Sequence, residues 1–165
     1  MLRISNLLSL TLAASAALYA FQPATPYQNW LNQEVVWIIS PDERAAFQRL
    51  GTDEERQKFI EQFWLRRDPT PGTQVNELRD EHYRRIAQAN DRFGYGSTPG
   101  WQSDRGRIYV KFGPPDEKEE HREASPAFEK WRYRLIGRAT NVMAEFRDDS
   151  GQGQYRMISD PFGTP

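Results

Sequence analysis

The sequence contains no cysteine among its 165 residues. This absence excludes a disulfide framework, a lipid anchor attached to cysteine, and thiolate chemistry with metals or redox partners. The chain also lacks a clear excess of one charge, since 22 basic and 23 acidic residues give a formal net charge of −1. Nucleic-acid binding usually depends on a basic excess, so we expect no nucleic-acid partner.

One long apolar run is present, and it lies at the N-terminus. It extends over residues 4–18, follows Arg3 and becomes rich in alanine toward its end, a pattern typical of a secretory signal peptide. The alternative, a retained membrane anchor, is disfavoured because the run is shorter than the roughly 20 residues of a spanning helix. We predict a signal peptide at 1–20, with cleavage between about Ala16 and Ala20. Export to the periplasm or the medium follows, with no membrane span after cleavage.

The remaining chain has the length of one domain. Residues 21–40 are interpreted as a lead-in, in which a proline-rich start precedes a short apolar segment that fits either a helix or a strand. Residues 41–165 are expected to form a single domain. Aromatic residues make up 13% of the chain, which is enough to build a core without cross-links.

Three helices are predicted in the first half of the chain. Two of them, over residues 41–50 and 53–66, begin at capping boxes in which a serine or threonine precedes a glutamate by three residues. Two prolines follow the second helix and prevent its continuation. The longest helix is predicted over 73–93, where apolar residues recur every three or four positions.

The second half of the chain shows alternating patterns typical of half-buried strands. A polar segment at 116–123 is interpreted as an exposed loop or short helix. The order of elements predicts an α+β fold with about three helices followed by an antiparallel sheet of three to four strands. The predicted strands are 107–112, 129–136, 141–147 and 155–159.

The segment Gly100-Trp101-Gln102-Ser103-Asp104 resembles the motif after which the GWxTD domain family of exported bacterial proteins is named. Ser103 stands where the motif has threonine and keeps the hydroxyl group. The resemblance extends to most of the mature chain and implies export, but no particular reaction. The further blocks that carry it are 52–56, 63–69, 81–86, 105–109 and Gly113-Pro114-Pro115-Asp116-Glu117.

Arginines, carboxylates and aromatic rings cluster within these blocks, and two interpretations remain open. As a latch, Asp104 or Asp68 would bind an arginine and tie the helices to the sheet. As an interface, the rings and guanidinium groups would face outward toward a partner. The candidate residues for binding or latching are Trp101, Ser103, Asp104, Arg105, Arg107, Gly113, Pro114, Pro115, Asp116, Trp64, Arg66, Arg67, Asp68 and His82.

His82 lies on the apolar side of the longest predicted helix, where it fits either a buried, hydrogen-bonded histidine or a site residue. No spacing matches a known metal motif, and we expect neither a metal nor a cofactor. Asp104 and Asp116 would form a glycosidase-like pair only if the fold placed them ~5–10 Å apart. Ser103 lacks the glycine-flanked turn that exposes a serine nucleophile.

The sequence therefore favours an exported cell-envelope domain that binds a protein partner without catalysis. The alternative is an envelope hydrolase acting on glycan or peptide through Asp104, Asp116 and His82, and a third interpretation is a structural spacer. An enzyme requires polar groups that converge in a concave pocket, whereas an interaction domain requires an exposed aromatic patch or strand edge. The oligomeric state is left open.

Overall fold

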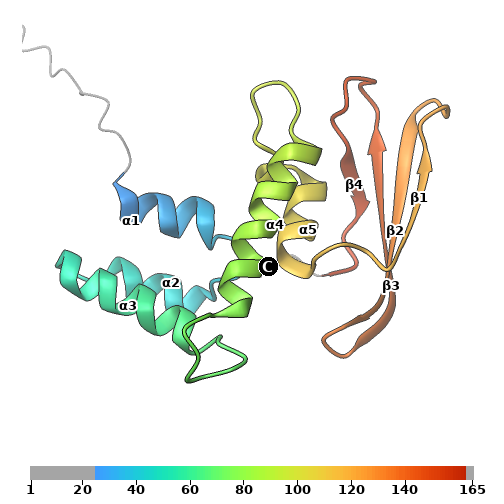
Figure 1. The fold of residues 1–165 in the computed structure, drawn as a ribbon. Coiled ribbons are helices and arrows are strands. Elements are labelled where there is room, and N and C mark those ends of the chain that lie inside the picture. The colour runs from blue at the N-terminus through green and yellow to red at the C-terminus, as the bar shows by residue number, and fades with distance from the viewer. Residues whose placement is uncertain (1–24, 163–165) are drawn as a thin grey trace, which may run out of the picture.

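The structure, a computed structural model, describes residues 25–162. Helices come first, and a four-stranded antiparallel sheet of order β1-β2-β3-β4 follows (Figure 1), which confirms the predicted α+β class. The predicted signal peptide at 1–20 lies outside the described residues. Within residues 25–162, no helix is both long and apolar enough to cross a membrane.

The first helices form a layer of their own, here called the helical lobe. Both predicted capping boxes are present: Ser40 with Glu43, and Thr52 with Glu55. In each box the side-chain hydroxyl and the glutamate satisfy backbone N–H groups that the first helical turn leaves free. The helices of the lobe are α1 (Pro26–Asn29), the π-helical η1 (Trp30–Glu34), α2 (Pro41–Gln48) and α3 (Asp53–Leu65).

An aromatic core holds the helical lobe together. The Trp30 ring packs 4.9 Å from Phe47 and 5.2 Å from Phe63, measured between ring centroids. Trp30, Leu31 and Val35 are buried with these rings. Much of the segment interpreted as a lead-in is therefore helical and belongs to the core of the lobe.

The longest helix, α4 (Glu77–Phe93), begins four residues later than predicted. Asn76 explains the difference, because its side-chain oxygen accepts from the N–H of Arg79 at 2.9 Å and caps the helix. The amide nitrogen of Asn76 donates to the carbonyl of Trp64 at 2.8 Å, which joins α4 to the end of α3. The helix ends at Phe93, followed by Gly94 as predicted.

The strand predicted over 107–112 is wrong: these residues belong to helix α5 (Asp104–Phe112), which follows the 3-10 turn η2 (Gly100–Gln102). Helix α5 lies between α4 and the sheet (Figure 1), so it is buried on several sides and its apolar residues include the adjacent trio Ile108, Tyr109 and Val110. Apolar residues on all sides of a short helix resemble the alternation of a strand, and periodicity alone does not separate the two.

The sheet confirms three predicted strands and adds one. The segment at 116–123, expected to be a loop or short helix, contains an edge strand. Its residues are charged because an edge strand has one unpaired side, and Glu117 forms ion pairs with Arg132 and Arg134 of the neighbouring strand. The strands are β1 (Glu117–His121), β2 (Ala127–Ile136), β3 (Ala139–Asp148) and β4 (Arg156–Ser159).

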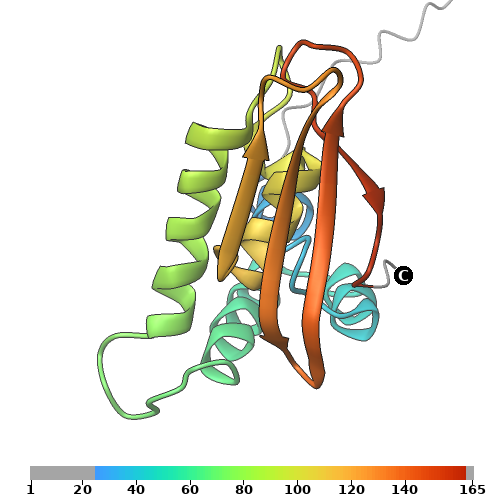
Figure 2. The same cartoon turned by 90° about the vertical axis from the view of Figure 1, so that its right-hand side faces the viewer.

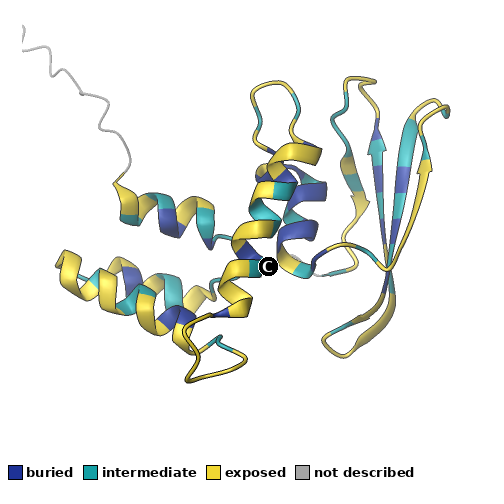
Figure 3. Ribbon diagram, in the orientation of Figure 1, coloured by how far each residue is buried: buried dark blue, intermediate teal, exposed yellow. Residues whose placement is uncertain are grey.

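A second core lies between α4, α5 and the sheet. Figure 2 shows α5 directly behind the strands, and Figure 3 shows that burial is concentrated on α5 and on the strands that face it. Phe93, Tyr109, Trp131 and Phe146 form the aromatic centre of this core. The indole nitrogen of Trp37 donates to the carbonyl of Trp101 at 2.9 Å and connects the helical lobe to this second core.

Glu43 couples the stability of the helical lobe to pH. Burial raises the pKa of Glu43, but hydrogen bonds from Arg67, Ser40 and Arg66 outweigh it and lower the pKa from 4.5 to about 2. A carboxylate with a lowered pKa in the folded state stabilises the protein above its unfolded pKa, and this contribution is lost as the pH falls toward the folded value. The contribution of Glu43 is therefore present above about pH 4.5 and lost toward about pH 2.

We expect Glu43→Gln to keep the capping box and to remove both ion pairs. Thermal unfolding at pH 7 should show a loss of about 1 kcal/mol, or roughly 3 °C. The difference from the unmodified chain should shrink as the pH is lowered from 4.5 toward 2. Glu55→Gln is the matched control, because Glu55 closes the other capping box without an arginine ion pair among the described residues. A pH-independent loss for Glu43→Gln would contradict this assignment.

Candidate functional site

The segment Gly100-Trp101-Gln102-Ser103-Asp104, here called the signature segment, lies where backbones pack closely. An ideal Cβ atom on Gly100 would lie 1.8 Å from the carbonyl oxygen of Ala89, and one on Gly106 would lie 1.8 Å from the carbonyl oxygen of Gly100. The backbones of α4, η2 and α5 thus meet with no space for a side chain. Glycine is required at both positions because only glycine permits so close an approach.

Trp101 and Ser103 complete this junction from inside the fold. Trp101 is buried, and its backbone N–H donates to the side-chain oxygen of Asn90 at 3.1 Å. Ser103 is the N-cap of α5: its hydroxyl oxygen accepts from the N–H of Gly106 at 3.0 Å and donates to the carbonyl of Gly100 at 2.7 Å. The Ser103 side chain caps the start of α5, whereas Trp101 joins η2 to α4 through its backbone.

Asp104 ties α5 to the sheet, but not through the arginine that the latch hypothesis required. Its carboxylate accepts from the backbone N–H of Met157 on β4 at 2.8 Å. Asp68, the other carboxylate considered, accepts from the N–H of Thr70 at 3.0 Å and forms a local turn. Within residues 25–162 neither aspartate pairs with an arginine, which corrects that expectation, and on α5 it is the next residue, Arg105, that forms the buried ion pair.

The ion pair between Arg105 and Glu129 connects α5 to β2. The nitrogen-to-oxygen distance is 2.8 Å, and the two side chains are 10% and 3% exposed. The second oxygen of Glu129 accepts from the indole N–H of Trp131 at 3.0 Å and lies 3.3 Å from the Lys118 amine. The Arg105 guanidinium lies over the ring of Tyr155, 3.9 Å from its centroid. Charge, hydrogen bonds and an aromatic face all hold this arginine in place.

Sequence reasoning missed Glu129, although a signal was present. Glu129 shares the parity of Trp131 and Tyr133 in β2, the side of the strand that is buried. A charged residue on the inward face of a strand requires a buried partner. Applied to the predicted strand, that rule would have identified Glu129 as a buried carboxylate that needs a cationic or hydrogen-bonding partner.

The other candidate residues around the signature segment lie within α5 or follow its C-terminal end. Arg107 forms an ion pair with Asp160 at 3.3 Å. Gly113 ends α5 with a positive φ of 87°, and its carbonyl accepts from the hydroxyl of Tyr133 at 3.0 Å. Pro114 and Pro115 lie between α5 and β1, and Asp116 accepts from the N–H of Arg134 at 2.7 Å.

The candidates from the end of α3 bind within the helical lobe instead. Arg66 and Arg67 both pair with Glu43, at 3.2 and 2.7 Å. Trp64 is buried, with its ring centroid 5.5 Å from that of His82. The candidate set therefore divides into one group around α5 and another around α3 and α4.

His82 is buried, and its Nε2 atom lies 2.7 Å from the carbonyl oxygen of Glu34. Burial lowers the pKa of His82, so the ring is neutral at pH 7. The cavity beside it is lined by neither Asp104 nor Asp116. The three residues of the hydrolase alternative have separate partners, an arrangement that does not favour shared acid–base chemistry.

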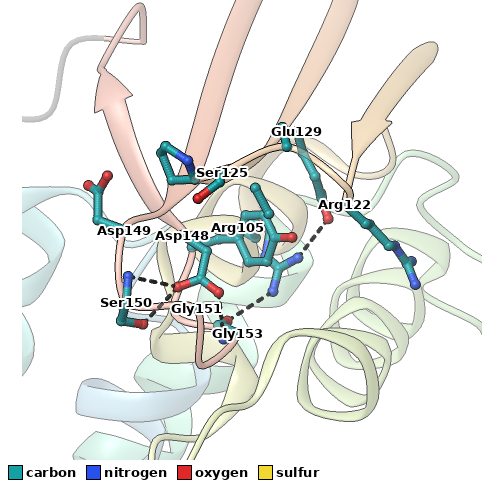
Figure 4. Close-up of a pocket in the computed structure, with 13 residues that line it drawn as sticks. Arg105, Arg122, Ser125, Glu129, Asp148, Asp149, Ser150, Gly151 and Gly153 are labelled. Atoms are coloured by element: carbon teal, nitrogen blue, oxygen red, sulfur yellow. Dashed lines mark hydrogen bonds and ion pairs between the residues drawn. The ribbon is translucent and has the colours of Figure 1, made fainter.

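An open pocket, here called the loop pocket, lies at the end of the sheet where Arg105 approaches the surface (Figure 4). Its volume is about 700 Å³. Arg105 and Glu129 contribute to its base, and its walls come from the β1–β2 and β3–β4 connections at 122–126 and 149–155 and from the adjoining strand ends. Loops that a rigid sheet positions around a pocket are a common place for binding sites.

Asp148 organises one wall of the loop pocket. It accepts from the hydroxyl of Ser150 and from the N–H of Gly153, both at 2.7 Å, and from the N–H of Ser150 at 3.2 Å. Burial raises the pKa of Asp148, but these hydrogen bonds outweigh it and lower the pKa below its usual value. The Asp148 carboxylate therefore stabilises the β3–β4 loop through these hydrogen bonds.

Arg105 has donors that the fold does not use. A guanidinium carries five N–H donors. Within residues 25–162, its acceptors are Glu129 and, at a long 3.5 Å, the carbonyl of Gly153, while the buried Nε atom has none. No group of three or more His, Asp or Glu side chains in the same residues is arranged to hold a metal ion. Because the Nε atom is buried, the donors that Arg105 presents to the loop pocket are the Nη hydrogens that Glu129 and Gly153 leave unused.

Comparison with known proteins identifies one family. The family model of the GWxTD domain matches residues 9–160, nearly the whole chain. No curated protein matches the chain, and no solved structure does.

We expect Gly100→Ala to destabilise the protein by about 3 kcal/mol or more, because the added methyl group would overlap the backbone of α4. Gly51→Ala is the matched control, since the nearest atom to its Cβ would be a flexible Glu55 oxygen at 3.8 Å. The free energy of unfolding of Gly51→Ala should stay within about 0.5 kcal/mol of that of the unmodified chain. Urea unfolding followed by tryptophan fluorescence measures both, and equal effects would refute the role assigned to Gly100.

We expect Arg105→Met to cost about 3–5 kcal/mol, because it leaves Glu129 buried without its main cation. Adding Glu129→Gln removes the unpaired charge and retains an acceptor for Trp131, so the double variant should be more stable than Arg105→Met alone. Guanidinium unfolding of Arg105→Met, Glu129→Gln and the double variant measures the coupling between the two residues. Additive losses would show that the pair does not act as a unit.

Proposed function

We propose that this chain, which belongs to the GWxTD domain family, is an exported cell-envelope domain that binds a protein partner and catalyses no reaction. The observation that carries the proposal is the state of the loop pocket. Its buried carboxylates are already bound by neighbouring groups, whereas Arg105 retains donors that the fold does not use.

The chemistry of the loop pocket favours binding over catalysis. Acid–base and nucleophilic catalysis require a nucleophile beside a group that takes its proton. The Ser150 hydroxyl does donate to Asp148 at 2.7 Å, but the lowered pKa of Asp148 makes it a weak base. Glu129 is engaged by Arg105, Trp131 and Lys118. No observation in the structure favours the hydrolase alternative.

The rim of the loop pocket suits a polypeptide segment. One wall carries Arg122 and the other Asp149, with side chains 77% and 63% exposed. A ligand that presents both acceptors and donors would engage both walls and the free donors of Arg105. The peptide backbone has one of each per residue. Support for export comes from the apolar leader at 1–20.

Site-specific photo-crosslinking in living cells tests the proposal. A photoreactive residue at Ser150, on the wall of the loop pocket, should give a discrete protein adduct. The same residue at Arg84, whose side chain is 61% exposed on α4, is the control and should not give that adduct.

A second pair of variants establishes that the pocket itself is responsible. Ala124→Trp places a large ring in the loop pocket and should abolish the Ser150 adduct. Ala139→Trp places the same ring at the opposite end of the sheet and should leave the adduct intact. The proposal fails if Ser150 gives no adduct. It also fails if the purified chain cleaves peptide or glycan and Ala124→Trp abolishes that activity.

A further inference from the structure

A second cavity lies between the helical lobe and the α4–α5 pair, and it shares helix α5 with the loop pocket but none of that pocket's lining residues. This helix crevice has a volume of about 260 Å³. Apolar and cationic side chains line it together with one carboxylate and one histidine: Ile38, Leu78, Val110, Arg67, Arg85, Lys111, Glu81 and His82.

One face of α4 brings the two kinds of side chain together. Leu78 and Arg85 are seven residues apart and therefore lie on the same face of the helix, with His82 between them. Leu78 is 42% exposed although it is apolar. His82 is neutral at pH 7 because burial lowers its pKa, so it adds no charge to the crevice.

The charges at the helix crevice do not cancel. Glu43 is shared by Arg66 and Arg67, at 3.2 and 2.7 Å. Glu81 is likewise shared by Arg84 and Arg85, the latter at 2.7 Å. In each cluster two arginines share one carboxylate, so the net charge of the cluster is positive. Of the residues that line the crevice itself, Arg67, Arg85 and Lys111 are cations and Glu81 is the carboxylate, so the lining has a positive excess beside its apolar walls.

Of the three cations that line the helix crevice, Arg85 has the most unused donors. Among the described residues, only its Nε–H has an acceptor, the Glu81 carboxylate. Its guanidinium lies against Gly113, where an ideal Cβ atom would be 3.0 Å from Cζ and from Nη2. The side chain is 25% exposed. A flat, partly desolvated guanidinium with free Nη donors is well suited to a carboxylate, which accepts two parallel hydrogen bonds.

We propose that the helix crevice binds the C-terminus of a partner polypeptide, with the terminal carboxylate on Arg85 and Lys111 and an apolar last side chain against Leu78, Ile38 and Val110. The size of the crevice supports this, because about 260 Å³ is below the ~300–1,000 Å³ of pockets that enclose a whole small ligand. The crevice accommodates the end of a longer molecule. Capture of a C-terminal carboxylate is a recurring mode of peptide recognition.

The test uses the purified chain and an N-acetylated peptide that ends in Gly-Ser-Leu. Two-dimensional ¹H–¹⁵N NMR should show shifts at Leu78, Val110 and Lys111 when the free-carboxylate peptide is added. Amidation of the peptide C-terminus should weaken binding about tenfold or more, since it removes the charge-assisted hydrogen bonds.

Two neighbouring arginines provide matched variants. Arg85→Gln should weaken binding about tenfold, because Arg85 faces the helix crevice. Arg84→Gln removes the same charge from the same Glu81 cluster, but Arg84 is 61% exposed and does not line the crevice, so it should have little effect. Lys111→Gln is the second crevice variant, and it carries the test if Arg85→Gln does not fold.

Several results would overturn the proposal. Equal binding of the acid and the amide would remove the role of the carboxylate, and equal effects of Arg84→Gln and Arg85→Gln would indicate a general charge effect. Binding of octanoate at the crevice without binding of the peptide would assign the site to a fatty acid. If millimolar peptide caused no NMR shifts at residues of the helix crevice, the crevice would not bind a peptide C-terminus. None of these results bears on adducts at Ser150, so this proposal and that for the loop pocket stand or fall separately.

Discussion

The buried ion pair between Arg105 and Glu129 is the interaction on which the arrangement of the second core depends. A buried charge is costly unless it is paired and hydrogen-bonded, and here each partner has the other within 2.8 Å. Because Arg105 lies at the start of α5 and Glu129 lies in β2, the pair determines how the helix sits on the sheet. The same arginine contributes to the base of the loop pocket, so one interaction serves both the fold and the proposed binding site.

The signature segment is used for packing, and this bears on where activity is to be found. Gly100 and Gly106 permit backbone contact, Ser103 caps α5, and Asp104 holds β4. A motif whose residues pack backbones and cap a helix identifies a fold and does not by itself indicate a reaction. The two surfaces that we propose for a partner are the loop pocket and the helix crevice, where Arg105 and Arg85 have donors that their carboxylate partners do not take up.

Local sequence signals predicted the helical lobe more accurately than the region around α5. Capping boxes at Ser40 and Thr52 depend on residues three positions apart, so they can be recognised in the sequence. The strand predicted over 107–112 was wrong because burial on several sides hides the helical period. The charges of β1 hid an edge strand for the opposite reason, since its unpaired side faces water. Of the central ion pair, Arg105 was a candidate from sequence and Glu129 was not.

The sequence by itself determined the α+β order, the caps of the first helices and three of the four strands, because each depends on neighbouring residues or a short period. Only the tertiary structure decided which carboxylate meets Arg105, which donors of Arg85 stay free, and that His82 contacts Glu34 rather than either aspartate. These contacts join residues far apart in the chain. Their partners are selected by the packing of whole helices and strands, and that packing leaves no pattern in any single stretch of sequence.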